Sequence, residues 1–384
     1  MRKNKVIILI LALCLFLGLT ACGDNSNSNI DNKDIKDLDD GIVRICLLIN
    51  GNLGDMSFFD SAKAGMEKFA KDYPEVEVKI IEMGTDNSRW EPTLRQTAND
   101  SFDLIIVGTS QMTEPLQRLV KMSKYQDRRF IIFDAEIEDN KATNYPTVHS
   151  IVFKQNEGGY LAGALSALVT NDLGKTNTGF IGGMKIDIIN DFGYGFMQGV
   201  ERVNQDKNIN IKAYNAYIGD FSNSPKGNSL ANTMYTTGNA EILFAAASQA
   251  GLGCLDAAKN KNKYIIGVDS DQYDYFKDTD SLKANQIVTS ILKRVDLALY
   301  EACENFLNQT LTYGDLQYLG IKEGKIGFVR NSNYEEKIPL EIRQYIENLH
   351  DDILSEQLIV KSGLKRFTPI EQLNEMYDLM DPNK

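Results

Sequence analysis

The feature that most constrains the fold is an alternation of apolar strand-like segments with helix-like segments, which runs along the chain twice. The strand-like segments are short runs rich in branched aliphatic residues, and the segments between them carry apolar residues at helical spacing. Strands that alternate with helices form βαβ units and a parallel sheet. The first series has predicted strands at 43–49, 76–83, 103–108 and 130–134 and predicted helices at 57–73, 90–99 and from 113 onward.

The second series predicts helices at 155–170, 191–204, 222–237 and 253–260 and strands at 178–182, 209–217, 242–246 and 264–268. One long helix at 287–307 and a short strand at 326–329 follow. The repetition predicts two similar α/β lobes with parallel sheets. We expect an N-terminal lobe at 41–148 that is completed by about 285–330, a C-terminal lobe at 149–284, and a helical extension at 331–384 that packs on the lobes.

Polar and glycine-rich stretches follow five of the predicted strands, at 50–55, 108–111, 182–185, 247–251 and 269–272. Ligands of open parallel sheets bind outside the carboxyl ends of the strands. In a protein with two such lobes, we therefore expect these loops to face each other across a cleft.

The N-terminus has the pattern of an export signal. Arg2, Lys3 and Lys5 precede an apolar run at 6–19, and small residues lead from it to Cys22. Such a run is too short to cross a bilayer of about 30 Å comfortably. The ending Leu-Thr-Ala-Cys resembles the bacterial lipobox, in which the cysteine is acylated. We expect a signal peptide at 1–21, a lipid on Cys22 and a flexible polar tether to residue 40, which hold the protein at the extracytoplasmic face of the cell membrane. The alternative is an ordinary signal peptide with a chance cysteine.

Composition excludes several classes of function. Removal of the signal leaves 38 of the 41 basic residues against 53 acidic ones, a formal net charge near −15, which disfavours nucleic acid as a partner. Of 5 cysteines, Cys46, Cys254 and Cys303 lie in the expected folded region, and buried small side chains are the favoured interpretation for all three. The chain has 2 histidines and no Gly-x-Ser-x-Gly or Walker glycine loop, so we expect no metal, no cofactor and no enzymatic activity.

Several stretches together resemble the basic membrane protein family of ABC-importer binding lipoproteins, which includes the purine nucleoside receptors of spirochaetes. The matching stretches run over nearly the whole mature chain and come in the expected order. They are Gly54-Asp55-Met56-Ser57-Phe58, FKQNEGGYLAG at 153–163, Gly179-Phe180-Ile181-Gly182-Gly183, Phe192-x-x-Gly195-Phe196-x-x-Gly199, the segments 251–253 and 257–259, Ile266-Gly267-Val268-Asp269-Ser270-Asp271-Gln272, and 289–296.

The resemblance implies a type I periplasmic-binding fold, in which two hinged α/β lobes close on a ligand and deliver it to an ABC permease. The implied ligand is a nucleoside, with a purine as the expected base. Phe58, with Phe59 as its rival, and Phe196 match family positions that would sandwich the base, one from each lobe. The alternative for each phenylalanine is a place in the hydrophobic core.

The same resemblance puts Asp269 and Lys293 against the ribose hydroxyls, with Lys293 in the first turns of the long helix. Asp55 would accept hydrogen bonds from the base. The alternatives are a helix cap or turn for the two aspartates and a solvated face for the lysine.

Two departures from the family pattern leave the ligand open. Met56 and Phe59 replace the lysine and asparagine of the family, and the small-residue segment ending at Gly251 carries Gln249. Ser110 and Gln111, in a polar loop after the third strand, are further candidates for ligand contact. A flavin or another flat heterocycle is therefore an alternative ligand, and a sensor that presents its ligand to a membrane receptor is an alternative function. We expect a monomer.

Overall fold

The computed structural model describes residues 41–137, 145–364, 368, 371–372 and 375. The predicted signal peptide, Cys22 and the tether lie outside these residues, as does part of the expected C-terminal extension. All that follows concerns the described residues from 41 onward.

The first sheet, sheet A, is entirely parallel, in the order β11-β5-β4-β3-β1-β2. Its central strands are buried aliphatic runs, whereas the edge strand β2 alternates between exposed and half-buried residues. The strands are β1 (Arg44–Ile49), β2 (Glu77–Glu82), β3 (Leu104–Gly108), β4 (Arg129–Phe133), β5 (Val148–Phe153) and β11 (Asp315–Leu319).

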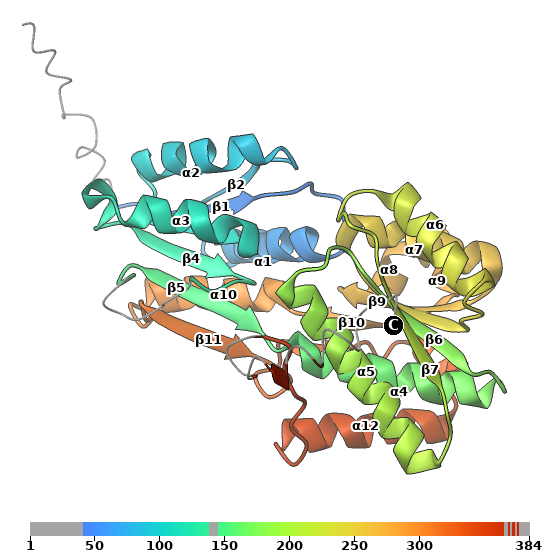
Figure 1. The fold of residues 1–384 in the computed structure, drawn as a ribbon. Coiled ribbons are helices and arrows are strands. Elements are labelled where there is room, and N and C mark those ends of the chain that lie inside the picture. Colours follow the sequence, from blue (N-terminus) through green and yellow to red (C-terminus); the bar gives the residue numbers. More distant parts are fainter. Residues whose placement is uncertain (1–40, 138–144, 365–367, 369–370, 373–374, 376–384) are drawn as a thin grey trace, which may run out of the picture. The chain divides into compact units, whose positions relative to one another are not determined.

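Helices cover both faces of sheet A, because successive side chains of a strand point to opposite faces. Ile45 and Leu47 join the core under α1 (Phe58–Asp72) and α10 (Val295–Leu307), whereas Cys46 and Leu48 join the core under α2 (Trp90–Asn99) and α3 (Thr113–Val120) (Figure 1). Three short 3₁₀ turns complete this lobe: η1 (Asn87–Arg89), η2 (Ser110–Met112) and η3 (Ser123–Tyr125).

The second sheet, sheet B, has the order β12-β10-β9-β8-β6-β7, and only its edge strand β12 runs antiparallel. Phe180 and Phe244 face α4 and α5, and Ile181 and Leu243 face α6 and α7. The strands are β6 (Asn177–Gly182), β7 (Lys212–Tyr217), β8 (Ile242–Ala246), β9 (Tyr264–Asp269), β10 (Ile287–Lys293) and β12 (Ile326–Phe328). The helices are α4 (Gln155–Asp172), α5 (Asp187–Lys207), α6 (Ser224–Thr236), α7 (Ser248–Lys261), α8 (Gln272–Phe276), α9 (Ser281–Ala284), α11 (Ser332–Lys337) and α12 (Leu340–Leu354), which packs on α4.

Glycines let α4 and α5 approach closely. A Cβ added to Gly163 would lie 2.0 Å from the carbonyl oxygen of Phe196, and one added to Gly199 would lie 2.0 Å from that of Tyr160. Neither position tolerates a side chain without separation of the two helices. This close pairing fixes the start of α5, which carries several residues of the site described below.

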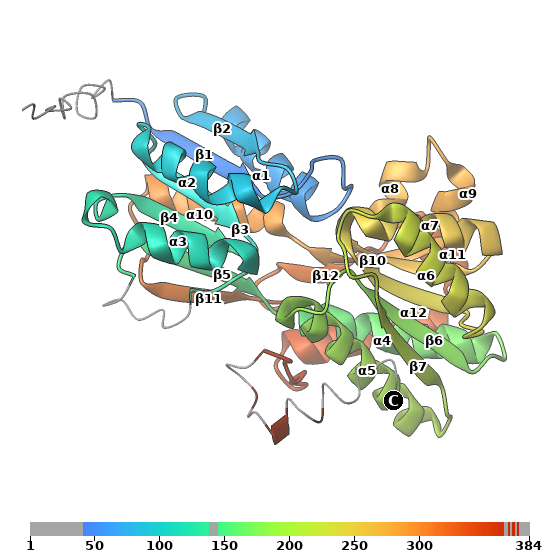
Figure 2. The same cartoon turned by 45° about the horizontal axis from the view of Figure 1, so that its top comes forward.

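The chain crosses between the two sheets three times: from β5 to α4, from β10 to α10, and from β11 to β12 (Figure 2). Two α/β lobes with mostly parallel sheets confirm the predicted fold class. The predicted lobe boundary at 148/149 falls at the start of β5, which pairs with β4 in sheet A. Within 285–330, only α10 and β11 join the first lobe, because β10 and β12 pair within sheet B.

The predicted long helix at 287–307 is wrong in its first part. Ile287–Lys293 is a strand, and the helix begins at Val295. A continuous apolar run does not distinguish a buried strand from a buried helix. The strands β5 and β11 were not predicted either, because His149, Ser150 and Gln317 interrupt their apolar pattern.

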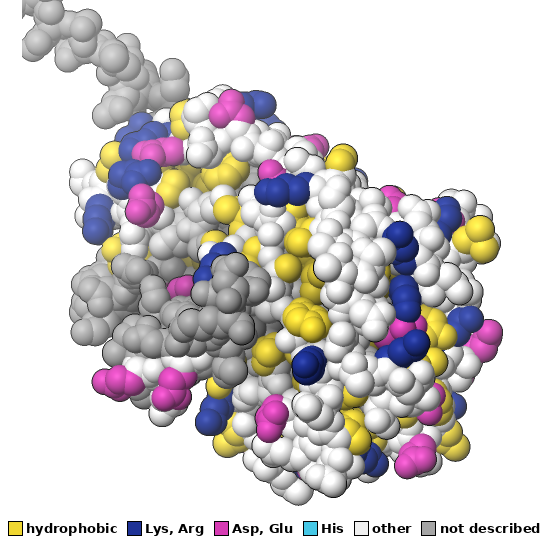
Figure 3. Space-filling model, turned by 45° about the vertical axis from the view of Figure 1, so that its right-hand side comes forward, with side chains coloured by type: hydrophobic (Ala, Val, Ile, Leu, Met, Phe, Trp, Pro, Cys, Tyr) yellow, Lys and Arg dark blue, Asp and Glu magenta, His cyan; other side chains and the backbone are white. Residues whose placement is uncertain are grey.

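The three cysteines of the described chain, Cys46, Cys254 and Cys303, are free and buried. None of the described helices combines the length and the apolar character that a membrane crossing needs. On the face drawn in Figure 3, basic and acidic side chains are both spread over the described residues.

Candidate functional site

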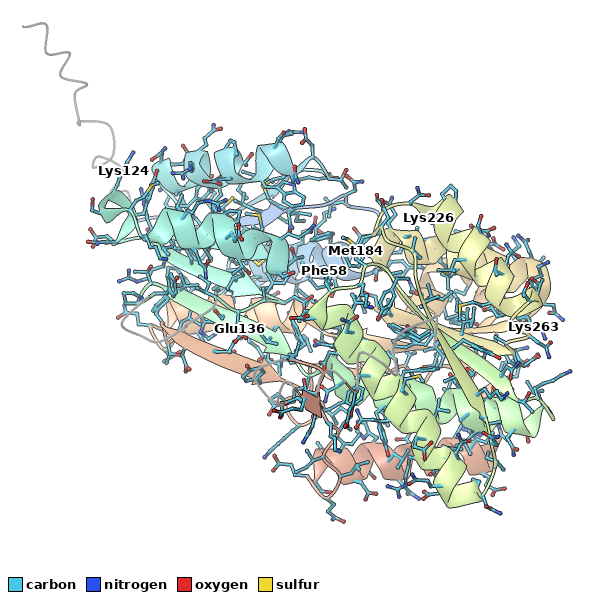
Figure 4. All side chains as sticks on the ribbon, in the orientation of Figure 1. Phe58, Lys124, Glu136, Met184, Lys226 and Lys263 are labelled. Atoms are coloured by element: carbon cyan, nitrogen blue, oxygen red, sulfur yellow. The ribbon has the colours of Figure 1, made fainter. Side chains whose placement is uncertain are left out.

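A cavity of about 300 Å³ lies at the carboxyl ends of strands from both sheets. This is the position at which open α/β sheets bind ligands, and the volume is at the lower end of the range for small-molecule sites. Phe58, at the start of α1, and Met184, after β6, both line the cavity, one from each lobe; both are labelled in Figure 4. The lobe of sheet A contributes residues 50–52, 58–59, 85, 90, 109–111 and 134, and the lobe of sheet B contributes 184, 186, 188–189, 192, 219–222, 246–249, 268–269 and 293.

Unusual backbone conformations surround this cavity. Five non-glycine residues with positive φ lie at or after the ends of β1, β3, β4, β8 and β9, and all but the first line the cavity: Met56, Thr109, Asp134, Ser248 and Asp269. Thr109, at φ 69°, is β-branched and therefore a clear outlier. Such conformations cost about 1–3 kcal/mol each and cluster at functional sites. The strained loops thus mark the same place as the cavity.

Aromatic rings form the apolar part of the wall. Phe58 stacks on Phe133 with ring centroids 5.6 Å apart, and Phe59 meets Phe58 edge-on at 5.2 Å. Trp90 and Phe192 also line the cavity. Phe58 and Phe59 come from the first lobe and Phe192 from the second, so flat surfaces are available on both sides.

Phe196 does not reach the cavity. Its side chain is 0% exposed and stacks on Phe244 with centroids 6.2 Å apart in the core beneath α5. Phe192, one helical turn earlier on α5, lines the cavity instead. Phe192 and Phe196 lie on the same face of α5 and both contact Phe244, but Phe192 is one turn nearer the start of the helix, where the cavity lies. We therefore propose Phe192, in place of Phe196, as the ring that faces the ligand.

Lys293 ends β10, and its ammonium group forms an ion pair with Asp134, which follows β4. The Lys293 side chain is only 2% exposed. Its Nζ lies 5.4, 5.2 and 5.5 Å from the ring centroids of Phe58, Phe153 and Phe192, within the range of cation–π attraction. A charged donor is thus held at the cavity wall, and the ion pair joins the two sheets. Lys293 lies on a strand and not, as predicted, in a helix.

Asp269 ends β9 and lines the cavity, where its carboxylate accepts a hydrogen bond from the Ser57 hydroxyl group. Burial raises the pKa of Asp269 to about 7; Lys293 and Ser57 oppose this rise, and the nearby carboxylates of Asp55 and Asp134 add to it. The second oxygen of the Asp269 carboxylate remains an acceptor that a ligand hydroxyl group can use.

Asp55 is 1% exposed and does not line the cavity. Its carboxylate accepts from the backbone N–H groups of Ser57, Phe59 and Asp60 at 3.1, 3.0 and 3.1 Å, and from the Ser248 hydroxyl group at 2.8 Å. Burial raises the pKa of Asp55. The arrangement corresponds to the alternative expectation, a cap at the start of α1, with an added bond to the second lobe.

Of the other predicted residues, Ser110, Gln111 and Gln249 line the cavity, whereas Gly251 lies one turn further along α7. Sequence reasoning missed Asp134 and Phe192. The end of the strand at 130–134 was the available signal for Asp134, and the spacing of aromatic residues on α5 was the signal for Phe192. Among the described residues, no group of three or more metal-ligating side chains is placed to hold a metal ion.

The comparisons with known proteins agree with this geometry. The family model Bmp, described as "ABC transporter substrate-binding protein PnrA-like", matches residues 42–362. The chain belongs to this family. Basic membrane protein A2 of Borrelia garinii subsp. bavariensis is 31% identical over 360 residues, which cover 93% of this chain and 96% of the relative. Basic membrane protein A of Borreliella afzelii is 32% identical over 330 residues, which cover 84% of this chain and 93% of the relative.

Among solved structures, the ABC transporter solute-binding protein of Aeropyrum pernix K1 superposes with a TM-score of 0.74 at 21% identity, covering 88% of this chain and 98% of that chain. At this identity the likeness concerns the fold. The Bmp-family chain is thus a substrate-binding protein of an ABC transporter and not an enzyme. Such a protein binds a small molecule and delivers it to the permease.

Proposed function

We propose that the protein captures a nucleoside, with a purine as the expected base, between its two lobes and delivers it to the permease of an ABC importer. The observation that carries the proposal is the composition of the cavity wall. Aromatic rings from both lobes, Phe58 or Phe59 and Phe192, lie near a corner that holds Asp134, Asp269 and Lys293. A nucleoside has the matching parts, a flat base and a sugar with several hydroxyl groups.

Each part of the ligand has a proposed partner. The base stacks on the phenylalanine rings, an interaction that gives about 1–3 kcal/mol per base. The ribose hydroxyl groups donate to the carboxylate of Asp269 and accept from the ammonium group of Lys293, and bonds to charged groups are about twice as strong as neutral ones. Ser110, Gln111 and Gln249 supply polar groups that select among bases.

The proposed mechanism is closure of the lobes about the three crossovers. Because the proposed contacts come from both sheets, the ligand binds the closed form better than the open form and shifts the balance toward closure. The free energy of that shift equals the difference in affinity between the two forms, so a ligand that touched one lobe alone would not close the protein.

We also propose that a lipid on Cys22 anchors the protein outside the cytoplasm. The polar composition of residues 23–40 supports a flexible tether. A tether raises the effective concentration of the lobes near the permease, so a captured ligand is delivered without diffusion of the protein.

The test begins with mass spectrometry of the small molecule released when freshly purified full-length protein is denatured. Ligand-free protein is then titrated with inosine, adenosine, cytidine, riboflavin and ribose. Trp90 is the only tryptophan of the chain and lines the cavity, so its fluorescence reports occupancy. We expect purine nucleosides to bind most tightly. Saturation by riboflavin or by ribose alone, with no response to any nucleoside, would refute the proposal.

A further inference from the structure

We propose that the turn 54–57, which we call the latch turn, holds the two lobes together, and that Asp55 and Met56 are positioning residues that do not touch the ligand. The latch turn follows β1 of the first lobe, yet its hydrogen bonds reach two loops of the second lobe, after β8 and after β9. The inference rests on the proposed function only in assuming that the lobes open and close around a ligand.

The hydrogen bonds of Asp55 leave few acceptor positions on its carboxylate for a ligand. A carboxylate has about four lone-pair positions, and four protein donors occupy them. Three of these donors are backbone N–H groups at the start of α1, and the fourth is Ser248 at the start of α7. The carboxylate therefore ties the start of a helix in one lobe to the start of a helix in the other.

The rest of the latch turn bonds to the loop after β9. The Ser57 hydroxyl group donates to Asp269, and the Ser57 carbonyl oxygen accepts from the Ser270 hydroxyl group at 3.4 Å. The Met56 carbonyl oxygen accepts from the Gln272 side-chain amide at 3.3 Å. With the bond to Ser248 and a longer one from the Ser57 hydroxyl group to the Val268 carbonyl oxygen at 3.5 Å, five hydrogen bonds run between the latch turn and the second lobe.

The Met56 side chain adds an apolar contact. It packs against the hydrophobic cluster between sheet B and helices α6 and α7, whose other members among the described residues all lie between Ile181 and Ile287. Met56 is thus the one described residue of the first lobe in that cluster. It has φ 49°, a conformation that is unfavourable for a side chain and that persists when contacts hold it. Separation of the lobes would expose Met56 and its cluster to water.

The order of the contacts points to a latch and not to a part of the hinge. In sheet B the crossover strand β10 is followed by β9 and then by β8. Asp269 ends β9, next to the crossover strand, whereas Ser248 follows β8, one strand further away. Rotation about the crossovers would therefore separate Asp55 from Ser248 more than it separates Ser57 from Asp269. These contacts need no ligand, so we infer that they keep part of the ligand-free protein closed.

The test measures closure by single-molecule energy transfer between dyes on full-length protein in detergent. Lys124→Cys places one label on the first lobe and Lys226→Cys places the other on the second; both lysines are exposed (Figure 4). The described cysteines are buried, so the new thiols react preferentially. The latch is tested at Met56, because Ser248 lines the cavity and its removal would also alter the site. Met56→Ala removes the apolar contact, and Met56→Lys restores the residue type of the family pattern and places a charge in the cluster. Met122→Ala, at a methionine that is 38% exposed, is the matched control.

Without ligand, we expect the ratio of closed to open molecules to fall about tenfold in Met56→Ala and further in Met56→Lys. The control should leave the ratio unchanged. The tenfold expectation follows because partial burial of a methionine side chain changes an equilibrium constant by about a factor of ten. The same variants should bind the co-purified ligand more weakly, with the change mostly in the dissociation rate. Identical energy-transfer histograms for ligand-free wild type, Met56→Ala and Met56→Lys would overturn the latch. That outcome is independent of ligand identity, whereas failure of the proposed function would appear as absence of nucleoside binding in wild type.

Discussion

Phe192 and Phe196 lie one helical turn apart on α5 and should respond in opposite ways to the same substitution. Phe192 lines the cavity, whereas Phe196 is fully buried against Phe244. Replacement by leucine keeps an apolar side chain of similar size, and such swaps usually cost less than about 1.5 kcal/mol of stability. Both variants should therefore fold, which leaves the loss of a flat ring as the main difference.

At Phe192 the lost ring is the proposed stacking partner of the base. Stacking is worth about 1–3 kcal/mol per base, and 1.4 kcal/mol is a factor of ten, so Phe192→Leu should weaken nucleoside binding about 5- to 150-fold. Phe196→Leu should leave the dissociation constant within about twofold of wild type and lower the free energy of unfolding by about 1 kcal/mol.

The assay is titration of Trp90 fluorescence with the nucleoside that binds wild type most tightly, paired with urea unfolding of each variant. The unfolding data exclude a fold defect as the cause of weak binding. Equal affinities of Phe192→Leu and wild type, together with weakened binding in Phe196→Leu, would refute the assignment and restore the prediction made from sequence.

Three further predictions concern charge and anchoring. Lys293→Met should destabilise the protein by about 3–5 kcal/mol in urea, because it leaves the Asp134 carboxylate without its partner, and the added change Asp134→Asn should recover most of the loss. The raised pKa of Asp269, about 7 in place of 3.8, means that the folded protein keeps a proton that the unfolded chain releases. Stability of wild type relative to Asp269→Asn should therefore fall as pH rises from 4 to 7, by on the order of 2–4 kcal/mol, and a constant difference across that range would contradict it. Cys22→Ala should abolish incorporation of labelled palmitate and release the protein from membranes, whereas Cys303→Ala should do neither.

The parts of the fold that the sequence predicts are those with strong local patterns. Both series of strands and helices were found, because most helices carry a periodic apolar face, most strands are short apolar runs, and the loops between elements are polar. The exceptions lie at the crossovers. In strand β5, His149 and Ser150 interrupt the apolar pattern, whereas β10 is a buried apolar run that leads almost directly into α10, so its pattern does not separate strand from helix. The predicted boundary at 148/149 falls at the start of β5, because that strand was not predicted.

At the cavity, sequence patterns predicted the loops better than the individual residues. All five polar stretches after predicted strands lie at or next to the cavity wall, since the carboxyl ends of parallel strands meet at one edge of a sheet. Phe192 and Phe196 share one face of α5, so the choice between them depends on how far along the helix the cavity extends, and the sequence does not contain this information. Asp134 was not predicted as a site residue because its ion-pair partner, Lys293, lies 159 positions away in the sequence. Only the folded chain brings the two side chains together.

The position of Lys293 has a consequence for how binding and closure are connected. The residue ends β10, and α10 begins at Val295, so its backbone lies at a crossover while its ammonium group lies at the cavity wall. Through Asp134 the same ammonium group also joins the two sheets. A ligand that accepts a hydrogen bond from Lys293 therefore acts directly on a group that connects the lobes. Phe192, by contrast, contributes a surface and no bond between the sheets. Substitution of Phe192 should thus change affinity and leave the lobe distance of ligand-free protein unchanged, whereas substitution of Lys293 should change both, and the dye pair at positions 124 and 226 would separate the two effects.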